Sequence, residues 1–135
     1  MSLSRHELRY KAMTILYQAI LYDNNGIEYD INDIIDSQME EKSKFVSGIV
    51  IGVMDNKNAL DELANKYLEN WTIDRLGYTD QAILRIAIYE LMHTDTPDVT
   101  CIDEAIELAK EYSDDKVCKM INGVLDKIYH NEKSE

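Results

Sequence analysis

Glu90 and His93 are the two side chains whose types and spacing come nearest to metal chemistry. Di-iron helical bundles use this Glu-x-x-His spacing, but their sites need a second such pair and two further glutamates from facing helices. The sequence contains no second Glu-x-x-His pair. A histidine near a helix end, favoured there by the helix dipole, is the simpler interpretation. We therefore predict no metal site.

The remaining reactive residue types give no catalytic site either. Adjacent acids point in different directions on a helix and occur at predicted helix starts, where they stabilise the dipole: Glu40-Glu41, Asp103-Glu104 and Asp114-Asp115. No nucleophile elbow, P-loop or dinucleotide fingerprint occurs. Cys101 and Cys118 form neither a CxxC pattern nor a zinc spacing, so we expect two reduced thiols. We predict a protein that is not an enzyme and binds no cofactor.

Composition indicates one all-helical domain over residues 1–135. The chain has only 5 Gly and 1 Pro, too few for the frequent turns of an all-β domain. Its net charge of -12, from 26 acidic and 14 basic residues, disfavours non-specific attraction to DNA, RNA or anionic lipid and suits a basic protein partner. The longest apolar run, Ile49 to Met54, is too short to span a membrane. We expect a cytoplasmic protein without a membrane partner.

The elements that would position any site are organised around the stretch Thr79 to His93. Its apolar residues cover most of a helical circumference, so we expect the other helices to pack around it. Thr79 is the predicted N-cap. The remaining polar residues form a stripe at i, i+4 spacing, which predicts where this helix meets water or a partner: Gln81, Arg85, Tyr89 and His93.

The N-terminal half shows several further helix signals. Ser4 and Glu7 form a capping box that opens a helix running to about Tyr22. Its first turns are the clearest basic segment of the chain, although from the residues alone a solvated helix start is the favoured explanation. Asp30 is expected to cap a short helix. The helical pattern from Glu40 to Leu68 fits either one bent helix or two.

The C-terminal half continues the helical pattern. Trp71, Ile73 and Leu76 are expected to plug the space between the two halves. Thr100 is the predicted cap of the next helix, and Ser113 or Asp114 that of the last. In the last helix, Gly123 is expected to permit a close helix crossing. Residues 131–135 are predicted to fray.

Four motifs, in order and spacing, resemble the NusB family of transcription antitermination factors. They are ILYQA (Ile15–Ala19), WTIDRLGYTDQAILRIAIYELMH (Trp71–His93), IDEAIELAKEY (Ile102–Tyr112) and INGVLDKI (Ile121–Ile128). The resemblance implies two small helical bundles packed across one another, residues 1–70 and residues 71–130. It also implies that the protein pairs with the small-subunit ribosomal protein that serves as NusE. The pair would bind boxA RNA of nascent ribosomal RNA transcripts and help RNA polymerase, within an antitermination complex, to read through terminators.

The resemblance assigns roles to residues near both ends of the chain. The family's arginine-rich first helix falls on Arg5, His6 and Arg9, where phosphate contact is expected. The C-terminal RNA-facing region falls on Asp115–Asn122, and its expected contacts are Lys116, Lys119, Met120 and Asn122. The expected partner contacts are Tyr17, Asp80 and Arg85.

The sequence also departs from the family pattern. Family members commonly have Gly at Ser113, an acidic residue near Lys116 and Phe at Met120. Methionine cannot stack on a base as an aromatic ring does. An acidic protein with a small basic patch is expected to bind RNA weakly alone and more tightly with a basic partner. The alternative is a protein interaction module that keeps the fold but has lost RNA recognition; a fused methyltransferase has no room in 135 residues.

Overall fold

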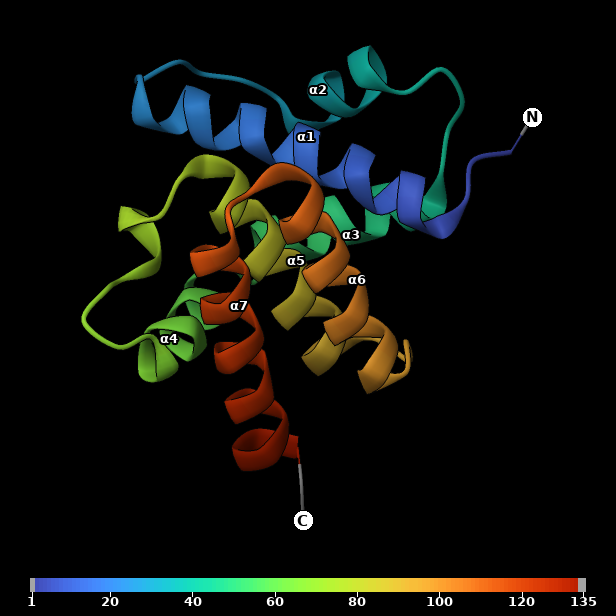
Figure 1. The fold of residues 1–135 in the computed structure, drawn as a ribbon. Helices are drawn as coiled ribbons and strands as arrows, with labels where there is room; N and C mark the ends of the chain where they lie inside the picture. The colour runs from blue at the N-terminus through green and yellow to red at the C-terminus, as the bar shows by residue number, and fades with distance from the viewer. Residues whose placement is uncertain (1, 134–135) are drawn as a thin grey trace.

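The structure, a computed structural model, describes residues 2–133. Every regular element in that range is helical, which confirms the predicted fold class. The elements are α1 (Arg5–Asn24), α2 (Ile31–Gln38), α3 (Lys44–Asp55), α4 (Lys57–Tyr67), the 3-10 turn η1 (Ile73–Arg75), α5 (Tyr78–His93), α6 (Asp98–Tyr112), α7 (Asp115–Ile128) and the π-helical turn η2 (Tyr129–Lys133). In Figure 1, α1 runs across the upper ends of α6 and α7, with α2 on its outer side.

The central position predicted for the apolar stretch is confirmed. α5 packs against α1, α3, α4, α6 and α7, and its side chains Ile83, Leu84, Ile88 and Leu91 are fully buried. A helix surrounded in this way needs apolar residues around most of its circumference. α4 packs against α5 and α7 as well as α3, so the division at residue 70 stays a prediction.

The helix starts predicted from the sequence agree with the structure at Asp30 and Asp114, where a side chain caps the helix. Asp30 and Asp114 both cap as predicted, through bonds to backbone N–H groups of the following turn. Thr79 and Thr100 were wrong as caps: α5 begins two residues after Leu76, behind Gly77, and α6 begins directly after Pro97. Gly77 and Pro97 occupy the N-cap positions instead, and neither helix start has a side-chain capping bond.

Glu40–Leu68 contains two helices, α3 and α4, joined at a single residue. Asn56 is both the C-cap of α3 and the N-cap of α4, and its amide nitrogen donates to the Gly52 carbonyl at 2.8 Å. Gly52 also packs directly against α5, because a Cβ there would overlap the ring of Tyr89. The close crossing predicted at Gly123 was wrong: a Cβ at Gly123 would meet no atom within 4 Å.

Residues 131–135 were predicted to fray, but the C-terminal turn is fixed by side-chain contacts as far as Lys133. The Glu132 carboxylate lies 2.8 Å from the Lys66 ammonium and accepts from the Tyr67 hydroxyl at 2.5 Å. The Lys133 ammonium donates to the Leu91 carbonyl at 2.6 Å and to the Asp98 carboxylate at 2.7 Å. Residues 131–133 are therefore tied to three helices, while residues 134 and 135 lie outside the described range.

Candidate nucleic-acid and partner interface

The first turn of α1 presents Arg5 to solvent. The predicted capping box is present: Ser4 Oγ accepts from the Glu7 N–H at 3.1 Å, and the Glu7 carboxylate accepts from the Ser4 N–H at 3.0 Å. The exposed Arg5 guanidinium lies over the Phe45 ring, with 4.2 Å from Cζ to the ring centroid. Arg5 takes part in none of the ion pairs among residues 2–133, so its charge can reach a phosphate.

His6 joins α1 to α6. Its Nδ1 lies 2.7 Å from the Glu104 carboxylate and its Nε2 lies 2.6 Å from the Glu111 carboxylate. The hydrogen bond to Glu104, assisted by that to Glu111, raises the pKa of His6 above 6.5 against the opposing effect of burial. Both ring nitrogens are engaged, so His6 would contact RNA only by giving up a carboxylate.

Arg9 is buried, which contradicts its predicted role as a surface phosphate contact. Its side chain is 4% exposed and that of Glu90 is 2% exposed. Arg9 donates from Nε and Nη2 to the two Glu90 carboxylate oxygens at 2.7 and 2.9 Å. Glu90 also accepts from the Thr96 hydroxyl at 3.2 Å. Arg9 therefore neutralises a carboxylate inside the fold and is not offered to phosphate.

The α7 residues predicted to face RNA are at the surface. Asp114 caps the helix by accepting from a backbone N–H of the first turn at 2.8 Å. Lys116, Lys119 and Asn122 are exposed, and Met120 is half-buried. Neither lysine takes part in an ion pair in the described part of the chain. Helical spacing puts Lys116 and Met120 on one face, with Asn122 turned away from it.

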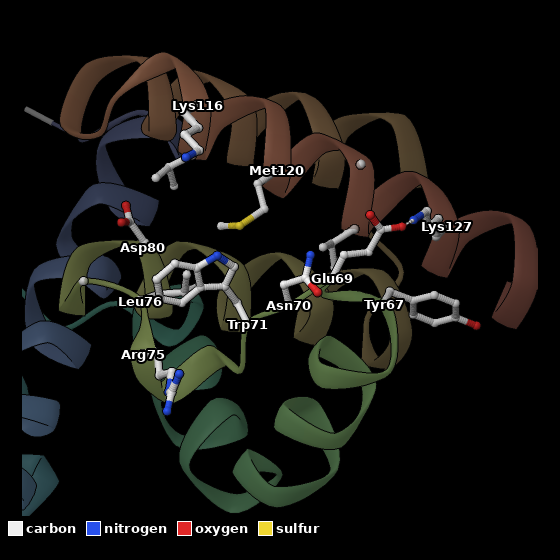
Figure 2. A pocket seen from close by; sticks show the side chains of 14 residues that line it. Tyr67, Glu69, Asn70, Trp71, Arg75, Leu76, Asp80, Lys116, Met120 and Lys127 are labelled. Atoms are coloured by element: carbon white, nitrogen blue, oxygen red, sulfur yellow. Dashed lines mark hydrogen bonds and ion pairs between the residues drawn. The ribbon is translucent and has the colours of Figure 1, made fainter.

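A groove of about 530 Å³ separates α7 from the connection between α4 and α5, and we name it the Trp71 groove. Figure 2 shows Met120 and Lys116 on the α7 side and Trp71 and Leu76 on the opposite side. The other lining residues are Tyr67, Glu69, Asn70, Arg75, Gly77, Asp80, Val117, Gly123, Val124 and Lys127. The groove brings predicted RNA contacts together with Asp80, a predicted partner contact.

Trp71 is the functional candidate that the sequence interpretation missed. Of the three predicted apolar plugs, Ile73 is 1% exposed, Leu76 is half-buried and Trp71 is 50% exposed. Trp71 follows Asn70, whose φ of 64° is in the left-handed region. Its polar neighbours in sequence, Glu69-Asn70 and Thr72, were the available signal of a surface position.

Tyr17 lies in a second hollow, of about 260 Å³, which we name the tyrosine surface. It is lined by Tyr10, Met13, Thr14, Tyr17, Thr79 and Tyr112. Tyr17 and Tyr112 are 41% and 44% exposed. Ring contacts fix these side chains: the Tyr10 and Tyr112 centroids are stacked 4.9 Å apart, and Tyr17 meets Tyr78 edge-on at 5.8 Å. Exposed, ordered aromatic side chains of this kind are typical of protein interfaces.

Arg85 does not lie on a surface that a partner could reach. Its Nε and Nη2 donate to the two Asp61 carboxylate oxygens at 2.8 and 3.1 Å, and its Nη1 donates to Gln81 at 3.1 Å. Arg85 and Gln81 are each 3% exposed. The prediction that this stripe meets water or a partner was therefore wrong for both residues, because α4 covers it. Asp80 is half-buried, and burial raises its pKa above 3.8.

The His, Cys, Asp and Glu side chains considered as metal ligands or reactive groups form no such site in the described part of the chain. Within the described range, no group of three or more His, Cys, Asp or Glu side chains could hold a metal ion. Cys101 and Cys118 are free thiols, and burial raises the pKa of Cys101 to about 12. None of the helices between residues 2 and 133 has the length and apolar character to cross a membrane.

Comparison with known proteins places this architecture in one family. The sequence profile of the NusB family matches residues 6–130. A transcription antitermination protein NusB from Staphylococcus haemolyticus is 42% identical over 127 residues, covering 93% of this chain and 99% of that protein. A NusB structure from T. maritima is 31% identical with a TM-score of 0.83, covering 97% of this chain and 94% of that one. A structure of antitermination factors NusB and NusE in complex with dsRNA is 25% identical with a TM-score of 0.76, covering 93% and 95%. This chain therefore belongs to the NusB family.

Proposed function

We propose that this chain is a transcription antitermination factor that pairs with the ribosomal protein serving as NusE and binds boxA RNA of nascent ribosomal RNA transcripts. The pair would act within the RNA polymerase antitermination complex and promote terminator read-through. The name of the Staphylococcus haemolyticus relative supports the antitermination role. The similar structure that contains NusB, NusE and dsRNA supports association with both partners.

The observation that carries the proposal is that the tyrosine surface and the Trp71 groove are lined by consecutive residues at the start of α5. Thr79 lines the first and Asp80, the next residue, lines the second. A protein docked on the tyrosines would therefore lie beside the groove, where it could share one RNA strand with α7. This geometry supports a joint RNA site rather than two independent ones.

The charge distribution supports the same arrangement. The chain carries a net charge of -12, which repels RNA at long range and attracts a basic protein. The cations proposed for phosphate contact are few: Arg5 on α1 and Lys116 and Lys119 on α7. A basic partner would add positive charge beside them, so tight RNA binding is expected from the pair and weak binding from the chain alone.

The test is a titration of boxA RNA with the chain alone, with the ribosomal protein alone and with their mixture, at two salt concentrations. A scrambled RNA of the same composition is the control. The mixture should bind boxA more tightly than either protein, and its affinity should fall with salt. Equally tight binding by the isolated chain would contradict the partner dependence.

A variant pair tests the partner surface. Tyr17→Ala with Tyr112→Ala removes two exposed rings from the tyrosine surface and should weaken partner binding at least about tenfold, because aromatic anchors dominate interface energies. Val99→Ala is the matched control, since Val99 is an exposed apolar residue, 70% exposed, outside both surfaces. Unchanged affinity in the double variant would remove this surface from the proposed interface.

The alternative function is a protein interaction module that has the same fold but no RNA recognition. The replacement of an aromatic residue by Met120 favours it, because a base-stacking ring is absent there. The RNA titration distinguishes the two functions. Partner binding without preference for boxA over the scrambled RNA would support the module and contradict the antitermination role.

A further inference from the structure

We propose that Trp71 is a base-stacking residue, on which one unpaired base of single-stranded RNA lies inside the Trp71 groove. The phosphates on either side of that base would be bound by Arg75 and Lys116. The inference rests on the proposed function and goes beyond it by assigning the ring that recognises RNA and two cations that flank it.

The first support is the position of the indole. Trp71 is the single tryptophan of the chain, is 50% exposed and lines the groove. Figure 2 shows the indole directed toward α7, with the Met120 thioether approaching from the opposite wall. A base between them would stack on the indole and be covered by a flexible apolar side chain.

The second support is the charge of the groove. Its lining includes three cations and two carboxylates, but Lys127 is already paired with Glu69 at 3.1 Å. Arg75 and Lys116 are exposed and take part in no ion pair in the part of the chain that the structure describes. Lys116 lies on the α7 wall, and Arg75 lies at the opposite rim with its guanidinium turned away from α7 (Figure 2). In an otherwise acidic chain, two available cations on either side of an aromatic residue match the phosphates that flank one base.

The shape of the groove favours an unpaired base over a duplex. Gly123 is exposed on the α7 wall, where no side chain fills the space, and the groove holds about 530 Å³. A duplex keeps its base faces stacked on one another, whereas a single strand can turn a base outward onto an aromatic ring. Trp71 thus offers the groove an aromatic face opposite Met120.

The first experiment uses the single indole as its own reporter. A single-stranded boxA RNA is titrated into the complex of this chain with its ribosomal-protein partner while indole fluorescence is recorded. Stacking should quench Trp71 in proportion to RNA bound. The complex carrying Trp71→Phe supplies the blank for any indole of the partner. Saturating RNA without a change in Trp71 emission would overturn the inference.

The second experiment measures affinity by anisotropy of labelled RNA. Trp71→Ala should raise the Kd about 5- to 150-fold, the equivalent of one lost base stack. Trp71→Phe keeps an aromatic face and should stay within about threefold. Val99→Ala, outside the groove, should match the parent. Circular dichroism confirms that each variant is folded before it is titrated.

Charge variants test the two phosphate contacts. Arg75→Gln and Lys116→Gln should each reduce the salt slope of log Kd by about 0.7, the value for one phosphate of a single strand. Lys42→Gln removes an exposed cation outside the groove and should leave the slope unchanged. If Arg75→Gln and Lys116→Gln have the same salt slope as the control Lys42→Gln, the assignment of Arg75 and Lys116 to phosphate contact is contradicted.

The outcomes separate the inference from the proposed function. If the parent complex does not prefer boxA RNA, both fail. If it binds boxA normally and Trp71→Ala binds equally well, the inference alone is overturned. If Trp71→Ala instead weakens binding of the ribosomal protein, the groove belongs to the protein interface, and the base-stacking role is likewise overturned.

Discussion

Replacing Glu90 by glutamine removes the charge that neutralises the buried guanidinium of Arg9. Both side chains are at most 4% exposed, and two hydrogen bonds of 2.7 and 2.9 Å join them. Breaking a buried ion pair by removing one partner costs about 3–5 kcal/mol. Glu104, whose carboxylate lies 3.9 Å from Arg9 Nη1, and the remaining amide oxygen compensate in part, so the lower end of this range is expected.

The size of the expected thermal shift follows from chain length. An unfolding entropy of about 2.1 cal/mol/K per residue means that 1 kcal/mol changes the Tm of a 135-residue domain by about 3–4 °C. Glu90→Gln should therefore lower the Tm by about 10 °C. Calorimetry gives the Tm, and urea unfolding followed by circular dichroism gives the free energy of unfolding.

A double variant distinguishes a lost charge pair from lost packing. Arg9→Met with Glu90→Leu replaces both ions by apolar side chains, and should recover most of the stability lost in either single variant. A Glu90→Gln loss below about 1 kcal/mol, or a double variant as unstable as the worse single one, would refute the reasoning. The same double variant should keep boxA affinity in the partner complex, whereas Arg5→Ala should reduce it and flatten its salt slope.

Three further predictions test other contacts of the fold. Because the pKa of His6 lies above 6.5, its stabilisation is complete below pH 6.5 and is lost as pH rises through the raised value. The Tm difference between the parent and His6→Ala should accordingly shrink from pH 5.5 to 8.5, and a constant difference would contradict this. Cys101 is buried and its pKa is raised to about 12, so it should resist a thiol reagent in the native protein, while the half-buried Cys118 should react. Labelling of both cysteines without denaturant would contradict this. Gly52→Ala should lower the free energy of unfolding by about 1–3 kcal/mol, because the added methyl group overlaps the Tyr89 ring of α5. Gly123→Ala should raise it by about 1 kcal/mol, because a Cβ there meets no neighbouring atom. Urea unfolding measures both values, and the opposite order would refute the packing argument.

The sequence predicted most features that depend on neighbours within one helical turn, although the caps at Thr79 and Thr100 were wrong. The Ser4 capping box and the caps at Asp30 and Asp114 involve residues two or three positions apart, so pattern alone suffices. The central position of α5 was predictable for a similar reason, because nearly continuous apolar character leaves no face for solvent. The division into two bundles came from the resemblance alone and stays a prediction.

Contacts between segments distant in the sequence could not be predicted from local sequence patterns. The partner of Arg9 lies 81 residues away, and that of Arg85 lies 24 residues away on another helix. Both arginines therefore looked like surface charges. The prediction for Trp71 was wrong in the opposite sense: its hydrophobicity predicted burial, but the side chain is 50% exposed, next to Asn70 with its left-handed φ.

The central position of α5 determines how the protein unfolds. α5 contacts helices from both halves of the chain, so neither half can separate without exposing the α5 side chains Ile83 and Leu84. Amide hydrogens of α5 should then exchange with solvent deuterium only through global unfolding, at rates that report the full stability of the domain. Exchange at α2, which packs chiefly on α1, should be faster. The molecule would therefore melt as one cooperative unit.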